Sequence, residues 1–155
     1  MRTPDGIAEA LDEGRSQAGR RLAAGVVTEL RLADQAPVLR AALQDPDDEL
    51  VSRVARGLGA IGDADSVDDL LAIVESTDRP WFCRAVAAGA LGTIGDPVAV
   101  PALAELLESG DRWMMHDRAA GALAQLGEEG HDALTRALRS PVEEVRELAA
   151  VALVA

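Results

Sequence analysis

The sequence predicts an all-α protein, an α-solenoid of about four helical hairpins followed by a terminal half-repeat. The first observation is an internal repeat. Residues 88–96 read AGALGTIGD, and similar segments occupy residues 55–63 and 120–128, so one unit recurs about every 32 residues. The second is the spacing of apolar residues after each copy: Leu103, Leu106 and Leu107 share one face of a helix. Sustained period-two alternation, which would predict strands, is missing from the sequence.

Glycine and proline place the turns of each hairpin. Gly62, Gly95 and Gly127 stand where a first helix must end in a left-handed residue, which glycine adopts at least cost. Pro37 and Pro101 stand at the start of second helices, where the missing N–H does no harm. We therefore expect a single domain, 1–155, with a capping helix at 1–15, repeats at about 16–45, 46–77, 78–109 and 110–139, and a half-repeat at 140–155.

The capping helix is predicted over residues 3–13. Thr3 is a suitable N-cap residue, and Pro4 fits the first turn. Ile7, Ala10 and Leu11 form its apolar face. We expect this face to cover the N-terminal end of the stack.

On these residues, together with the Val100–Leu103 segment VPAL, the chain resembles HEAT repeats of the short prokaryotic type found in phycobilisome lyase subunits. The resemblance spans about residues 16–155 and implies a right-handed superhelix. It also implies a ladder in which Arg84 and Arg146, early in first helices, pair with the Gly-Asp aspartate of a neighbouring repeat. Val51 and His116 interrupt that ladder. Members of the family serve as scaffolds, adaptors, enzyme subunits and, in a few cases, enzymes.

Composition excludes several classes of function. The formal net charge is -12, from 27 acids and 15 bases that are all arginine, and such a chain repels nucleic-acid phosphates. No apolar run suits a membrane span or a secretory signal, so a soluble, cytoplasmic protein is expected. A lone cysteine and two histidines disfavour disulfides and structural metal sites, and no cofactor is expected.

One row of equivalent positions, at the openings of the first helices, is unusual. Its members are Asp48, Trp81, Trp113 and Glu143, followed one position later by Phe82 and Met114. Tryptophan is enriched where protein partners anchor, and methionine gives adaptable apolar contacts. One interpretation is a binding site for a protein or peptide with an apolar anchor and basic flanks. The other is that each tryptophan only covers the loop between hairpins.

Two single residues have a structural and a functional interpretation. Cys83 aligns with Leu50 and Val145, so it is expected to be a small buried hydrophobe rather than a reactive thiol. His116 occupies the ladder position and most simply replaces a structural donor. Because it is near Trp113, it is also a candidate for a pH-sensitive partner contact.

The second helices carry a row of alternating charge that is expected to line the concave surface. Glu105 and Glu108 are followed one repeat later by Arg136 and Arg139. We expect the pairs Glu105–Arg136 and Glu108–Arg139, which would leave this surface nearly neutral.

The last helix is unusually apolar for a solvent-facing end. Leu148, Val151 and Val154 replace Arg53, Arg56 and Gly59 of the second repeat. This stripe indicates self-association, burial against another chain, or continuation into a longer array.

The repeat pattern favours a non-enzymatic scaffold or adaptor that binds proteins. Paired carboxylates such as Asp47 and Asp48 lie at helix starts, where the helix dipole favours them, and no catalytic constellation stands out. One alternative, implied by the resemblance, is an accessory subunit of an enzyme that handles a chromophore or small ligand. Another is a nucleic-acid-acting helical-repeat enzyme, which the charge disfavours.

Overall fold

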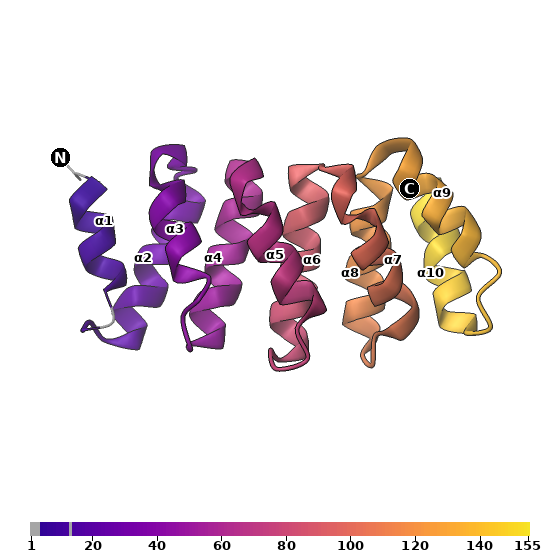
Figure 1. The fold of residues 1–155 in the computed structure, drawn as a ribbon, viewed down its shortest axis with the longest axis horizontal. Coiled ribbons are helices and arrows are strands. Elements are labelled where there is room, and N and C mark those ends of the chain that lie inside the picture. Colours follow the sequence, from indigo (N-terminus) through magenta and orange to yellow (C-terminus); the bar gives the residue numbers. More distant parts are fainter. Residues whose placement is uncertain (1–3, 13) are drawn as a thin grey trace.

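The computed structural model describes residues 4–12 and 14–155, and over this range the chain folds into helices joined by short turns (Figure 1). The α-helices are α1 Pro4–Leu11, α2 Gln17–Glu29, α3 Ala36–Ala42, α4 Asp48–Ile61, α5 Val67–Glu75, α6 Trp81–Ile94, α7 Val100–Ser109, α8 Trp113–Ala124, α9 Gly127–Ala137 and α10 Glu143–Val154. Short 3-10 turns precede three of them: η1 Ala33–Gln35, η2 Ala64–Ser66 and η3 Pro97–Ala99.

Successive hairpins stack along one axis. The hairpins are α2/α3, α4/α5, α6/α7 and α8/α9, and they follow one another from the N-terminal to the C-terminal end of the molecule (Figure 1). The first helices α2, α4, α6 and α8 pack on one another in sequence, and α10 packs against α8 and α9. The predicted all-α solenoid is therefore confirmed.

The predicted turns are observed at Gly62 and Gly95, which follow the last residues of α4 and α6 and have φ of 76° and 84°, in the left-handed region. Gly127 also has a positive φ, 66°, but it is the first residue of α9, and α8 ends earlier than predicted, at Ala124. Pro37 and Pro101 lie in the first turns of α3 and α7. The 3-10 turns that open the second helices were not predicted, because their sequences, such as Ala64–Ser66, show no helical periodicity of their own.

α1 lies beside α2 and α3 at the N-terminal end of the stack. Ile7 and Leu11 are buried and belong to the same core as the repeats. The proposed cap residue Thr3 lies outside the described residues, as does Glu13 at the end of the predicted helix.

One continuous apolar core runs through the stack. It contains fully buried leucines from every hairpin, and both helices of a hairpin contribute. Examples are Leu39, Leu58, Leu70, Leu91, Leu103, Leu123 and Leu134. Each hairpin buries its apolar faces against its neighbours, so the hairpins depend on one another for stability.

The arginine ladder was predicted with the wrong acceptors: Arg84 and Arg146 bind backbone carbonyls and not the aspartates of the Gly-Asp turns. Arg84 Nε donates to the carbonyl oxygen of Val74 at 2.9 Å, and Arg146 Nη1 donates to that of Ser140 at 2.7 Å. The acceptors are carbonyls at or just after the end of the preceding second helix, where no intrahelical donor remains. The aspartates of the Gly-Asp turns are engaged elsewhere: Asp63 pairs with Arg40 at 2.8 Å, and Asp96 accepts from the backbone N–H of Val98 at 3.0 Å.

The interruptions of the ladder are compensated. His116 Nδ1 lies 2.6 Å from the carbonyl oxygen of Leu107, so it takes the place of an arginine in the fourth hairpin. Where Val51 provides no donor, Arg79 from the next hairpin reaches back to the carbonyl oxygen of Leu43 at 3.4 Å.

The predicted pairing of second helices is also wrong. Within the described residues, the ion pairs include neither Glu105–Arg136 nor Glu108–Arg139. Glu108 instead accepts a hydrogen bond from Ser140 Oγ at 2.7 Å. All four charged side chains are exposed, where solvent leaves an ion pair little net gain.

None of the helices in the described part of the chain is long and apolar enough to cross a membrane.

Candidate partner-binding rim

The unusual row of the sequence lies at the starts of four first helices. Asp48, Trp81, Trp113 and Glu143 are the first residues of α4, α6, α8 and α10. We call these four residues, with Phe82 and Met114, the rim. Because the helices are stacked side by side, the rim follows one end of the first-helix layer (Figure 1).

The two tryptophans of the rim are exposed. Trp81 is 38% exposed and Trp113 is 54% exposed. Phe82 is partly buried against the core and meets the Trp81 ring edge-on, with centroids 6.1 Å apart and an interplanar angle of 88°. Met114 is half-buried. Neither indole N–H donates to an acceptor within residues 4–12 and 14–155, so both Trp side chains offer an apolar ring and a free donor.

His116 lies behind the rim rather than on it. The side chain is buried, with 7% of the residue exposed, and its Nδ1 is taken by the Leu107 carbonyl. The hypothesis that His116 contacts a partner at the rim is therefore not supported by its position. Its neighbour in sequence, Met115, is fully buried.

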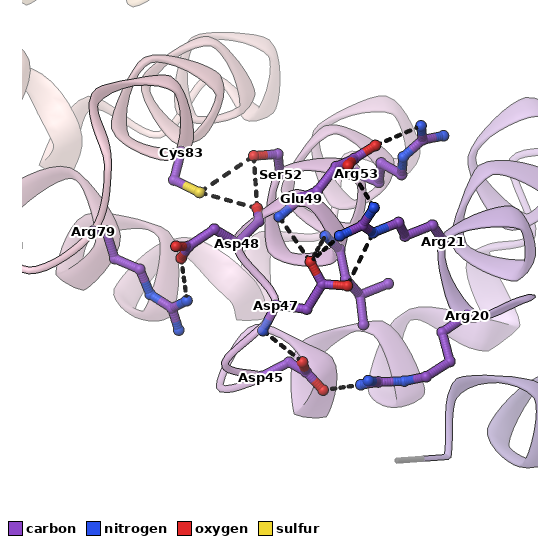
Figure 2. A network of polar contacts seen from close by, with 11 residues as sticks. Arg20, Arg21, Asp45, Asp47, Asp48, Glu49, Ser52, Arg53, Arg79 and Cys83 are labelled. Carbon is purple, nitrogen blue, oxygen red and sulfur yellow. Dashed lines mark hydrogen bonds and ion pairs between the residues drawn. The ribbon is translucent and has the colours of Figure 1, made fainter. Parts of the chain in front are cut away.

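The acidic end of the rim on α4 is neutralised within the chain. Arg79 Nη1 lies 2.7 Å from Asp48 Oδ1, and this pair bridges the second and third hairpins (Figure 2). A partner therefore meets a paired charge here. At the other end, exposed Glu143 forms no ion pair with the described residues.

A polar network continues from Asp48 toward the first hairpin (Figure 2). Arg21 donates two hydrogen bonds to the Asp47 carboxylate, from Nε at 2.9 Å and from Nη2 at 2.8 Å. Its Nη1 lies 2.6 Å from Glu49 Oε2. These hydrogen bonds hold the pKa of the Asp47 carboxyl below its usual value and raise the pKa of the Arg21 guanidinium. Asp47 also caps α4 by accepting from the backbone N–H of Glu49 and Leu50.

A second arginine fixes the same loop from the other side. Arg20 is buried, pairs with Asp45, and donates from Nε to the carbonyl oxygen of Leu11 at 3.1 Å. Asp45 in turn accepts from the backbone N–H of Asp47 at 2.8 Å. Arg20 is thus the ladder residue of the first hairpin. This role of Arg20 was not predicted, although its spacing of 31 residues from Val51 places it in the ladder row.

Cys83 lies directly beneath the rim and is fully buried, as predicted. Its thiol donates to the carbonyl oxygen of Asp48 at 3.1 Å and lies 3.3 Å from Ser52 Oγ (Figure 2). Burial raises the pKa of the thiol, which disfavours the reactive thiolate.

The apolar stripe of the last helix is partly exposed. Val151 is 64% and Val154 is 86% exposed, whereas Leu148 packs against the core. The surface available for self-association on α10 is therefore narrower than the sequence indicated.

Helical hairpins that stack in one direction around a continuous core define an α-solenoid repeat protein. The chain belongs to the HEAT-repeat family: the family model described as HEAT repeats matches residues 4–89 and again residues 76–154. None of the curated proteins matches the sequence.

Solved structures with this architecture include natural and engineered proteins. A chain from the complex of CpcE and CpcF of phycocyanin lyase from Nostoc sp. PCC7120 aligns with a TM-score of 0.76 and 26% identity, over 99% of this chain and 64% of that one. The protein thus spans less than two thirds of the lyase chain. An engineered protein aligns with a TM-score of 0.66 and 25% identity, over 97% of this chain and 46% of its own. A designed armadillo repeat protein shares the fold at a TM-score of 0.65 and 18% identity, over 96% of this chain and 79% of its own.

Proposed function

We propose that this protein is a non-enzymatic scaffold or adaptor whose rim binds another protein. The observation that carries the proposal is the pair of exposed tryptophans, Trp81 and Trp113, at equivalent positions of adjacent hairpins. Burial of exposed aromatic rings in an interface removes apolar surface from water and lowers the free energy, and Trp side chains dominate the energetics of many protein interfaces. Two such rings held by consecutive rigid helices form a preorganised surface.

The similarity to a chain from a two-protein complex supports a protein as the partner. The rim further suggests its chemistry. An apolar side chain would lie against Trp81 and Trp113, and a basic group would face Glu143. On the opposite side Asp48 already pairs with Arg79, so only one basic flank is required.

The test compares the proteins captured from native lysate by the immobilised wild-type chain and by a Trp81→Ala, Trp113→Ala variant. The captured protein is then purified and its affinity for both chains is measured by calorimetry. We expect the double variant to bind at least about 100-fold more weakly, because two hot-spot tryptophans are removed. Val98→Ala is the matched control, since Val98 is an exposed apolar residue of η3 outside the rim. A folded double variant with wild-type affinity would refute the proposal.

A second candidate function is an accessory subunit of a lyase-like enzyme. The alignment with the phycocyanin lyase chain over 99% of this protein favours it. The visible absorption spectrum of protein purified from its native source tests this candidate. A bound chromophore would support it, and a colourless protein that still binds its partner would favour the scaffold.

A further inference from the structure

A second surface of the molecule, distinct from the rim, is a groove of about 500 Å³ across the outer faces of α4, α6 and α8 and the turn after α2. Three arginines line it, Arg31, Arg56 and Arg118, and small residues form much of its floor. None of the rim residues lines this groove.

The floor of the groove contains two glycines that the fold does not require. Gly89 and Gly121 occupy equivalent positions in the middle of α6 and α8. A Cβ atom at Gly121 would meet nothing within 4 Å, and one at Gly89 would meet only the Arg118 side chain, at 4.0 Å. Glycine in a helix interior lowers helix stability relative to alanine. The folded chain gains no packing in return.

Other glycines of the same helices have a clear structural reason. A Cβ atom at Gly59 would lie 2.8 Å from the Cα of Ala90, so this glycine allows α4 and α6 to approach closely. The contrast shows that helix packing does not require Gly89 and Gly121, which leave the helix backbone open at the floor of the groove.

Arg31, which also lines the groove, has an unfavourable backbone conformation. It occupies the position of the first hairpin that corresponds to Gly62, Gly95 and Gly127, and it adopts the same left-handed conformation, with φ of 47°. Within the described residues it is the one non-glycine with positive φ. Such strain is most often retained where a side chain has a function. A glycine would adopt this conformation with less strain, so the turn itself does not require an arginine.

The groove is basic although the protein carries a net charge of -12. Arg31, Arg56 and Arg118 are exposed and form no ion pair within the described residues. Asp117 is the single acidic residue of the lining. Elsewhere arginines such as Arg20 and Arg40 are paired with aspartates. Three unpaired guanidinium groups are thus gathered around one cavity.

We propose that this groove binds an acidic segment of a partner protein. Arg56 and Arg118 would each hold a carboxylate through paired N–H donors, and the segment would approach the helix backbone over Gly89 and Gly121. A short segment with a few carboxylates is favoured over nucleic acid, because an extended phosphate backbone would meet the acidic remainder of the molecule. The rim and the groove would therefore take ligands of opposite charge.

The probe is a short fluorescein-labelled peptide rich in glutamate and alanine, measured by fluorescence anisotropy at low salt against the full chain. A peptide with glutamine in place of glutamate is the control ligand. We expect the glutamate peptide to bind at least about tenfold more tightly than the glutamine peptide, and Arg56→Ala or Arg118→Ala to weaken it by about tenfold. Arg53→Ala should leave binding unchanged, because Arg53 lies outside the groove and pairs with Glu49.

A steric variant separates binding from folding. Gly121→Leu should fill the floor and weaken the glutamate peptide by at least about tenfold without lowering the Tm, since leucine favours the helix. Gly25→Leu is the matched control, in the middle of α2 with nothing within 4 Å and outside the groove.

Several results would overturn the proposal. The glutamate peptide could fail to bind, or the glutamine peptide could bind equally tightly. The affinity could also remain unchanged in the Arg56→Ala, Arg118→Ala or Gly121→Leu variants. Equally tight binding of a single-stranded oligonucleotide would show an unspecific anion site. A dimer that Arg56→Ala dissociates would show that a second copy of the chain fills the groove. Neither the Trp81 nor the Trp113 variant should affect the peptide, so this test and that of the rim can fail separately.

Discussion

Gly92 of α6 lies against the backbone of Ala122 in α8, and a Cβ atom at Gly92 would come within 2.6 Å of the Ala122 Cα. The first helices of the third and fourth hairpins meet at this contact, which leaves no room for a methyl group. The same arrangement recurs one repeat earlier, between Gly59 and Ala90.

We therefore expect Gly92→Ala to destabilise the protein by about 1–3 kcal/mol, because the helices must move apart. Gly121→Ala adds the same methyl group to open space and should stabilise the protein by about 0.5–1 kcal/mol. Urea unfolding followed by circular dichroism measures both. Changes of the same sign in the two variants would contradict the packing described.

The hydrogen bond of His116 is predicted to stabilise the fourth hairpin. His116→Ala leaves the Leu107 carbonyl without its donor and opens a cavity, so a loss of about 2 kcal/mol is expected. His116→Arg restores the donor found in the third hairpin at Arg84 and should lose less. Thermal unfolding of the two variants makes the comparison, and an alanine variant as stable as the wild type would contradict it.

The charge of Asp47 is predicted to make stability depend on pH. Hydrogen bonds from Arg21 lower the pKa of Asp47 in the folded state, so the folded state binds its proton less readily than the unfolded state. The stabilisation is full above the unfolded pKa of about 3.9 and is lost as pH falls through the lower, folded pKa.

Asp47→Asn isolates this effect, because asparagine still caps α4. The difference in unfolding free energy between the wild type and this variant should be largest near neutral pH and should shrink below about pH 4. Asp68→Asn, at an exposed residue without an ion pair among the described residues, is the control substitution. A pH-independent difference for Asp47→Asn would contradict the prediction.

The sequence was sufficient for the hairpins and their turns. Gly62 and Gly95 repeat in register with apolar residues on both sides, and each observation is local. The sequence could not reveal which residues the long side chains pair with. Arg79 reaches Asp48 across 31 residues, and nothing in the sequence distinguishes it from an unpaired arginine.

The surfaces were predicted unevenly. Equivalent positions placed Trp81 and Trp113 in one row, because each opens a first helix. The groove was not predicted, because Gly89 and Gly92 look alike in the repeat. Only the packing shows that Gly92 faces a neighbouring helix and that Gly89 faces solvent.

The exposed valines of α10 are predicted to mediate self-association. Val151 and Val154 lie on one face of the helix, and their burial between two copies would remove apolar surface from water. Light scattering should show mass that rises with concentration, and Val151→Glu with Val154→Glu should abolish the rise. Ala150→Glu, at another exposed position of α10, is the control. A wild-type monomer at every concentration would contradict this prediction.

Fluorine NMR of the chain labelled with 5-fluorotryptophan tests whether the rim binds a protein. Trp81 and Trp113 are the two tryptophans of the sequence, so both signals report on the rim. Titration with the captured partner should shift both signals with the midpoint of the calorimetric binding curve, and the control Val98→Ala should behave in the same way. If both signals stay unchanged at a saturating concentration of the partner, the rim does not bind it.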